Sequence, residues 1–301
     1  MLENLIIETR GLSYRFGSQQ VLENISLKVS EGSIYGFLGP NGAGKTTTIK
    51  VLLNLLQTGE GKVFIFGKEL KHNRIEILSG IGSLIEQPAI YPHMSGRENL
   101  LNRAMLLRIP RARVDEILKL VGLSESAGKS AGKYSLGMKQ RLGIGLALLP
   151  DPKLLILDEP TNGLDPNGII EVRQLLQKLV SEQGKTVFVS SHLLSEIEKM
   201  VTHAGIINRG KLIFQGPIEE LHDASKKRLE IQTNDLLRSK EFLCTHGYQA
   251  EILSELIQIP FVSENQSAEI NSLLVKNDYK IYSLSQSKQD LENLFISITQ
   301  Q

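Results

Sequence analysis

The octapeptide "GPNGAGKT" at residues 39–46 has the residue types and the spacing that bind nucleotide phosphates. Its glycines let the backbone curl so that successive N–H groups point at phosphate oxygens, and a helix that begins there adds the positive end of its dipole. Lys45 is placed to bind the β- and γ-phosphates, and the Thr46 hydroxyl is placed to ligate Mg²⁺. The candidate nucleotide-binding residues of this loop are Asn41, Gly42, Ala43, Gly44, Lys45, Thr46 and Thr47.

Two acidic residues, Asp158 and Glu159, end a continuous apolar run at residues 154–157. A carboxylate at the carboxyl end of a parallel strand lies where ligands bind in such sheets. A pair of acids alone would cap a strand or lie in a solvated turn, but the phosphate loop favours a functional interpretation. We therefore expect Asp158 to hold Mg²⁺ and Glu159 to orient or polarise the attacking water.

A histidine, His192, ends the run "VFVSSH" and is expected at the same edge of the sheet. It is a candidate to donate a hydrogen bond to the γ-phosphate, and a purely structural hydrogen bond is the alternative. The candidate catalytic residues are therefore Lys45, Glu159 and His192, and the candidate metal ligands begin with Thr46 and Asp158.

The elements that must position these residues alternate along the chain. The apolar segment 33–39 predicts a buried strand that runs into the phosphate loop, and a helical pattern follows over 45–57. The segments 153–160 and 185–192 predict two further strands, with a helix over 169–184 between them. Strands that alternate with helices predict an α/β fold around a parallel sheet.

From about residue 226 the pattern changes to short strands and helices in the order β-α-β-β-α-β-α. That order is typical of a small split β-α-β domain. Acids and lysines are scattered along this segment as on a solvated surface, and no catalytic cluster is visible in it.

Composition excludes several classes of protein. The formal net charge of +1 argues against a general binder of polyanions such as nucleic acid. A single cysteine, Cys244, excludes an internal disulfide framework. The start "MLENLIIETRGL" has an early acid and no basic region, so no signal peptide is expected. No run of about 20 apolar residues predicts a membrane span, so a soluble or peripheral protein is expected.

Further motifs make the chain resemble the nucleotide-binding subunit of ATP-binding-cassette (ABC) transporters. "YSLGMKQR" at 134–141 is similar to the signature motif of that family, and "LLILDEP" follows it at the usual interval. "NGLDP" resembles the D-loop, with Asp165 as its acid, His192 resembles the switch histidine, and Phe16 resembles the aromatic residue that stacks on adenine. The signature departs from its commonest form because Leu136 and Met138 stand where glycines are usual.

The resemblance implies a P-loop NTPase fold of ABC type over residues 1–217, with a helical subdomain at about 88–150. Residues 218–301 would form a linker and a small α+β accessory domain. Two subunits would sandwich two ATP molecules with Mg²⁺, and Ser135 and Gly137 of one subunit would contact the nucleotide of the other.

The partners implied are transmembrane permease subunits and a second copy of the chain, with no nucleic acid. The location implied is the cytoplasmic face of the membrane. In this family the permease docks on the helical subdomain. Ile90, Tyr91 and Met94 are expected to be exposed and are candidates for that contact, and packing within the loop is the alternative.

Within the family, the chain resembles ABC-2 exporter subunits, and among these the subunits that confer self-protection against bacitracin and lantibiotic peptides. That resemblance includes the closing "DLENLFISIT" and predicts an ATPase that powers export of antimicrobial peptides. The alternatives are a soluble ABC ATPase acting on ribosomes or nucleic acid, an exporter of drugs or lipids, and a nucleotide-binding regulatory module without turnover.

In that branch, the loop that contains Glu86 and Gln87 departs from the usual pattern of the family. The family usually has a glutamine in this loop, which approaches the metal or the attacking water. Aligning "IGSLIEQP" on the family pattern places Glu86 at that position and Gln87 toward the permease. Glu86 is therefore a third candidate ligand of Mg²⁺, and a carboxylate should bind that ion more strongly than an amide does.

Overall fold

The computed structural model describes residues 4–224, 227–253 and 255–288. The chain folds into two compact units, Met1–Ile218 and Glu219–Gln301, and each is described here by itself. The closing segment "DLENLFISIT", for which a helix was expected, lies outside the described residues.

The centre of the first unit is a six-stranded sheet with the order β12-β11-β5-β10-β9-β8. The strands β8 to β11 and β5 are parallel, and only β12 at one edge runs antiparallel to its neighbour. Their bounds are β5 (Ile34–Leu38), β8 (Ile81–Leu84), β9 (Leu154–Leu157), β10 (Thr186–Ser191), β11 (His203–Asn208) and β12 (Lys211–Pro217).

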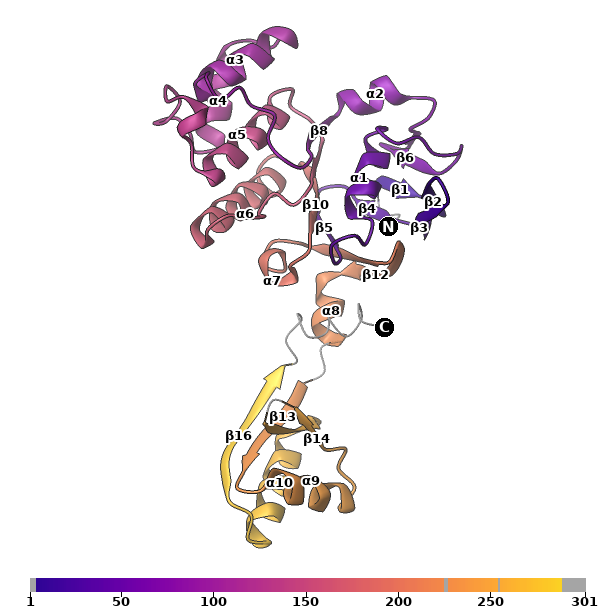
Figure 1. Ribbon diagram of the computed structural model, residues 1–301, viewed down its shortest axis with the longest axis vertical. Helices are drawn as coiled ribbons and strands as arrows, with labels where there is room; N and C mark the ends of the chain where they lie inside the picture. Colours follow the sequence, from indigo (N-terminus) through magenta and orange to yellow (C-terminus); the bar gives the residue numbers. More distant parts are fainter. Residues whose placement is uncertain (1–3, 225–226, 254, 289–301) are drawn as a thin grey trace. The chain divides into compact units, whose positions relative to one another are not determined.

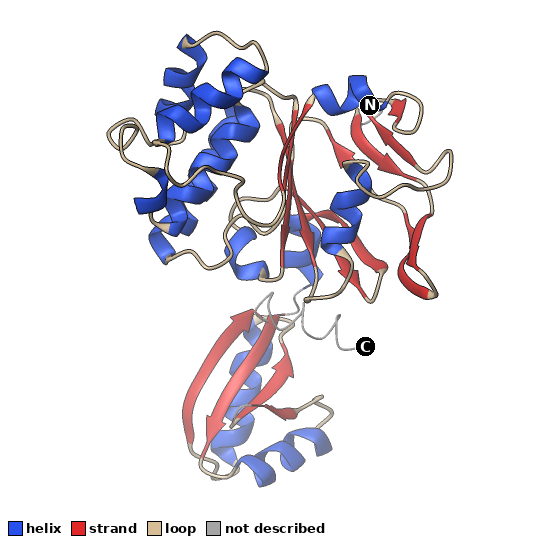
Figure 2. Cartoon of the chain, turned by 45° about the horizontal axis from the view of Figure 1, so that its top comes forward, coloured by secondary structure: helices blue, strands red, loops and turns tan. Residues whose placement is uncertain are grey.

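Both faces of this sheet are covered. Every residue of β5, β9 and β10 is buried, as expected where helices pack on both sides of a parallel sheet. Figures 1 and 2 show one group of helices on one side and α1, α2 and the antiparallel strands on the other. The predicted α/β fold around a parallel sheet is confirmed.

Three of the four helices on one side begin at a capping side chain. The group consists of α3 (Gly96–Leu106), α4 (Ala112–Leu120), α5 (Leu136–Leu148) and α6 (Pro166–Ser181). Ser95 and Glu98 form a reciprocal capping box at the start of α3, and the Ser135 and Asp165 side chains cap α5 and α6. The caps satisfy N–H groups that each first turn would otherwise leave unpaired.

The opposite side holds α1 (Lys45–Leu52), α2 (Arg74–Ser79) and two antiparallel sheets. One sheet has the order β4-β1-β6-β7, and β2 pairs with β3 as a ribbon. α1 is shorter than the predicted 45–57, because Asn54 adopts a left-handed conformation (φ 54°) that ends the helix. The strands are β1 (Leu5–Thr9), β2 (Leu12–Phe16), β3 (Gln19–Ile25), β4 (Lys28–Ser30), β6 (Val63–Ile65) and β7 (Lys68–Glu69).

The second unit is an antiparallel sheet with two helices on one face (Figure 2). Its strand order is β14-β15-β13-β16, and the chain order β-α-β-β-α-β agrees with the predicted split β-α-β domain. Leu229, Ile231, Ile257 and Ile259 alternate along β13 and β15 and are buried under the helices. The elements are β13 (Lys227–Thr233), α9 (Leu236–Thr245), β14 (Glu251–Leu253), β15 (Leu256–Pro260), α10 (Glu264–Lys276) and β16 (Ile281–Lys288). Two short helices precede β13 along the chain: α7 (Leu194–Ile197) lies in the first unit, and α8 (Ile218–Ala224) begins at the boundary and opens the second.

Candidate functional site

The phosphate loop joins the end of β5 to the start of α1, and its glycines are sterically required. Gly44 adopts φ 110°, and a Cβ there would lie 2.7 Å from Leu22 Cδ2. A Cβ on Gly39 would lie 2.3 Å from the Ile207 carbonyl oxygen. No side chain caps the start of α1, so the N–H groups of its first turn remain available to an anion. The loop therefore fits a phosphate group.

Lys45 carries the one cation of this loop and is 5% exposed. Its Nζ donates to the carbonyl oxygens of Gly39, at 2.6 Å, and Pro40, at 3.2 Å. It also lies 3.2 Å from Glu159 Oε1. A buried ammonium group needs such partners, and phosphate oxygens are chemically suited to replace them.

Thr46 and Asp158 meet across 112 residues of chain, with the Thr46 hydroxyl donating to Asp158 Oδ2 at 2.8 Å. Asp158 is 2% exposed. No cluster of three or more His, Cys, Asp or Glu residues suited to a metal occurs within the described ranges. Mg²⁺, however, keeps several waters and takes one or two protein oxygens beside substrate phosphates. The hydroxyl and the carboxylate fit that ion.

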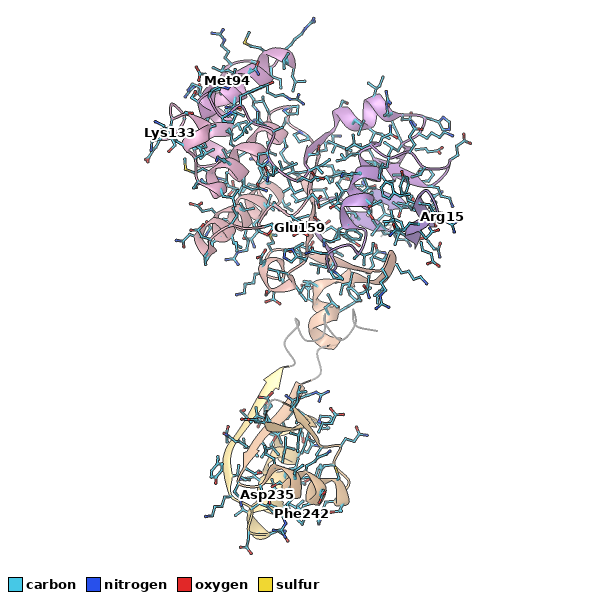
Figure 3. The ribbon with its side chains drawn as sticks, in the orientation of Figure 1. Arg15, Met94, Lys133, Glu159, Asp235 and Phe242 are labelled. Carbon is cyan, nitrogen blue, oxygen red and sulfur yellow. The ribbon has the colours of Figure 1, made fainter. Side chains whose placement is uncertain are left out.

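Glu159 lies at the end of the central sheet, at the position labelled in Figure 3. Its Oε1 faces Lys45, and its Oε2 lies 2.5 Å from His192 Nδ1. The backbone of Glu159 has φ 50°, which is uncommon outside glycine. The structure thus brings the three residues with predicted catalytic roles into one connected group, and the roles themselves stay predictions.

Three further hydrogen bonds join the segments around these residues, and the sequence did not predict them. The Ser190 hydroxyl contacts Asp158 and the Glu159 backbone, and the Thr161 hydroxyl donates to Glu196 Oε2 at 2.6 Å. The run "VSSH" places Ser190 near the end of its strand, but its contacts also require that β10 lie beside β9.

Phe16 and Glu86 lie on the surface. Phe16, at the end of β2, is 51% exposed, and its ring packs edge-on against Tyr14 at 5.1 Å. The Glu86 side chain is 66% exposed, and its Oε1 lies 3.0 Å from Lys50 Nζ. Within the described part of the chain, Glu86 has no contact with Thr46 or Asp158, so its role as a metal ligand stays a prediction.

The signature residues lie beside the D-loop of the same chain. A Cβ on Gly137 would lie 3.8 Å from Gly168 Cα and 3.9 Å from Leu164 Cδ2. Ser135 caps α5 by accepting the Met138 N–H at 3.2 Å, and Asp165 caps α6 by accepting the Gly168 N–H at 3.1 Å. Among the described contacts, none joins Ser135 or Gly137 to the phosphate loop.

A groove of about 550 Å³ lies between the edge strand β8 and the helices α3 and α5. Gln87, Ile90 and Tyr91 line it, together with Arg103 and Leu106 of α3. Tyr91 and Leu106 are 51% and 71% exposed. Ile90 and Met94 were both expected to be exposed, but both are half-buried. Ile90 is half-buried because its loop folds against the groove.

No helix in the described ranges has the length and apolarity that crossing a bilayer requires.

Comparison with known proteins finds relatives of this chain. The family described as "ABC transporter" matches residues 22–162. The chain is 43% identical to the bacitracin transport ATP-binding protein BcrA of Bacillus licheniformis, over 97% of both chains. It is 37% identical to the lantibiotic transport ATP-binding protein SrtF of Streptococcus pyogenes, over 78% of this chain and 99% of that one.

Among solved structures, cbiO1 of Clostridium perfringens, part of the ABC transporter complex cbiONQ, matches with a TM-score of 0.68 and 28% identity. The match covers 73% of this chain and 91% of that one. The fold class predicted from the sequence is thereby confirmed, and so is the predicted resemblance to ATP-binding subunits of ABC transporters. The chain belongs to the ABC transporter family, as one of its ATP-binding ATPase subunits.

Proposed function

We propose that this ATPase powers a membrane exporter of antimicrobial peptides of the bacitracin or lantibiotic type. The observation that carries the proposal is the 43% identity to a bacitracin transport protein over 97% of both chains. The matched region includes both units of this chain, so the similarity to that relative is not confined to the first unit.

The site suggests how this chain's residues act on ATP. The phosphate loop and Lys45 bind the phosphates, and the exposed ring of Phe16 offers a surface for stacking by adenine. Thr46 and Asp158, with Glu86 as a further candidate, would hold Mg²⁺, which neutralises charge that develops on the phosphates. Glu159 accepts a proton from the attacking water, and His192 holds that carboxylate and reaches toward the γ-phosphate.

The arrangement of the signature also supports a dimer of two copies. Gly137 lies beside the D-loop residue Leu164, and none of the described contacts joins Ser135 or Gly137 to the phosphate loop. A complete site would then need these residues from a second copy, with the N-terminus of α5 directed at its nucleotide.

The groove beside β8 supports a permease as partner. It combines exposed apolar side chains, Tyr91 and Leu106, with the polar groups of Gln87 and Arg103. A short amphipathic segment of a membrane subunit fits such a surface. The proposed location is accordingly the cytoplasmic face of the membrane, with the chain bound peripherally.

The test is reconstitution of the chain with its permease partner in vesicles. We expect bacitracin or a lantibiotic to stimulate ATP hydrolysis several-fold and to accumulate on the far side, and we expect neither with Glu159→Gln. Stimulation by lipids or unrelated drugs alone would contradict the peptide assignment. Co-sedimentation with ribosomes, the competing function, is not expected from a chain with a net charge of +1.

A further inference from the structure

A fully buried hydroxyl lies between the two acidic residues of the candidate site. Ser190, the second-last residue of β10, is 0% exposed. Its Oγ donates to Asp158 Oδ1 at 2.6 Å and accepts the Glu159 backbone N–H at 2.9 Å. A single side chain therefore contacts both acidic residues through one oxygen atom.

We propose that Ser190 is a positioning residue for ATP hydrolysis. It holds the Asp158 carboxylate toward Thr46, and it holds the backbone of Glu159 in the conformation that directs its carboxylate at Lys45 and His192. This inference rests on the proposed function of the site. It adds a residue that positions both Asp158, the proposed metal ligand, and Glu159, the proposed general base.

The two carboxylate oxygens of Asp158 have different partners. Oδ1 accepts from Ser190 and Oδ2 accepts from Thr46 at 2.8 Å, so the plane of the carboxylate is held at both ends. Because Asp158 is 2% exposed, water is poorly placed to replace a lost partner. Without the Ser190 hydroxyl, Oδ1 keeps an unmet acceptor and the carboxylate is free to rotate away from Thr46.

The backbone of Glu159 is held by the same hydroxyl. Its φ of 50° lies in the left-handed region, which a residue with a side chain adopts only where its surroundings hold it there. The bond from its N–H to Ser190 Oγ is such a restraint. It exists because β10 and β9 are parallel neighbours with Val189 opposite Leu157, so that the next residues along each strand adjoin.

The experiment uses the full chain and three substitutions. Ser190→Ala removes the hydroxyl, and Ser190→Thr keeps it. Thr186→Val is the matched control: Thr186 is in the same strand, is 0% exposed, and its hydroxyl accepts the Gly32 N–H at 2.9 Å at the opposite end of β10. Mn²⁺ affinity is measured by electron paramagnetic resonance with a non-hydrolysable ATP analogue, alongside kcat, the KM for ATP and the melting temperature.

We expect Ser190→Ala to weaken Mn²⁺ binding and to lower kcat by about 10- to 100-fold each, the usual effect of losing a residue that orients a metal ligand. The KM for ATP should change little, because Lys45 and the loop are untouched. Ser190→Thr should restore most of both, and Thr186→Val should match the wild type.

Wild-type Mn²⁺ affinity and kcat in a folded Ser190→Ala protein would overturn the inference, and so would an equal loss in Thr186→Val. A failure of the proposed peptide export is a separate result, because it would appear in the reconstituted transporter while the wild-type chain still bound and hydrolysed ATP.

Discussion

Lys45 and Glu159 form an ion pair across the candidate site, with Lys45 Nζ 3.2 Å from Glu159 Oε1. The second oxygen of the same carboxylate lies 2.5 Å from His192 Nδ1. Both oxygens of the proposed general base are therefore engaged, and one must be released before it can accept a proton from water. Phosphate oxygens that draw Lys45 toward themselves would release Oε1, which couples nucleotide binding to exposure of the base.

Glu159→Gln tests that role directly. The amide has the same shape but cannot take up a proton, so we expect hydrolysis to fall about 10²- to 10⁴-fold. ATP affinity should be kept or increased, because the loop, Lys45 and Thr46 are unchanged. Phosphate release and binding of a fluorescent ATP analogue are the measurements. Glu182→Gln, at an exposed ion pair with Lys178, is the control, and normal turnover in Glu159→Gln would exclude this base.

Lys45→Met is expected to weaken ATP binding rather than to slow only the chemical step. Hydrogen bonds to a charged group contribute about 1.5–3 kcal/mol, which corresponds to about 10- to 150-fold in affinity. Titration with a fluorescent ATP analogue measures the loss. Lys71→Met, which removes an exposed lysine paired with Glu60, should leave the affinity unchanged. An unaltered dissociation constant in Lys45→Met would place the phosphates elsewhere.

How far the sequence could predict this site depends on how local each contact is. Gly44, Lys45 and Thr46 follow one another, so their motif predicted the loop directly. The convergence of Thr46 with Asp158 also followed, because ligands bind where parallel strands end. The contacts of Ser190 depend on β10 being the neighbour of β9, and that strand order is set by packing of the whole sheet rather than by either segment.

The conformation of the loop after β8 was equally inaccessible from the sequence. Glu86 adopts φ 59°, a left-handed conformation that turns the chain immediately after the strand. The pairing of Glu86 with Lys50, 36 residues away, and the partial burial of Ile90 both follow from that turn. The alternation of apolar residues predicted the strands of the second unit. It carries no information about the φ angle of one residue such as Glu86.

Glu86→Gln tests the proposed third ligand of Mg²⁺. The pair with Lys50 is exposed and contributes at most about 1 kcal/mol, so the fold should be unaffected. If the carboxylate approaches the metal during turnover, the Mg²⁺ concentration needed for half-maximal hydrolysis should rise several-fold while ATP binding persists. Gln87→Ala, on the groove side, should leave hydrolysis by the isolated chain unchanged.

A second variant separates the metal from the ion pair. Lys50→Met breaks the same pair from its other end, so an equal change in Mg²⁺ dependence would assign the effect to Lys50. Identical Mg²⁺ titrations of the wild type and Glu86→Gln would remove Glu86 from the set of ligands.

Asp151 joins the helical group to the central sheet. We expect its carboxylate to make the free energy of unfolding depend on pH. Asp151 Oδ1 lies 2.7 Å from the Nζ of Lys185, the residue that precedes β10, and 3.1 Å from the Nη2 of Arg113 on α4. The hydrogen bond from Lys185, with the charges of Lys185 and Arg113, holds the pKa of Asp151 below its ordinary value of 3.8. A lowered pKa in the folded state stabilises the fold at pH values above 3.8, and that contribution is lost as the pH falls through the lowered value.

Asp151→Asn should therefore reduce the free energy of unfolding at pH 7 by about 1 kcal/mol or less, because the carboxylate is largely exposed. The difference from the wild type should shrink as the pH falls below about 4. Asparagine tolerates the left-handed backbone of Asp151 (φ 56°), so the substitution removes the charge without straining the turn. Urea unfolding at a series of pH values measures the difference.

Asp278→Asn is the matched control for this measurement, since Asp278 is exposed, has φ 64° and has no ion pair among the described residues. It should show no such dependence on pH. A difference between Asp151→Asn and the wild type that stays constant from pH 7 to pH 3 would show that Asp151 acts through the shape of the turn. A difference that shrinks with acidity assigns its effect to the charge that faces Lys185 and Arg113.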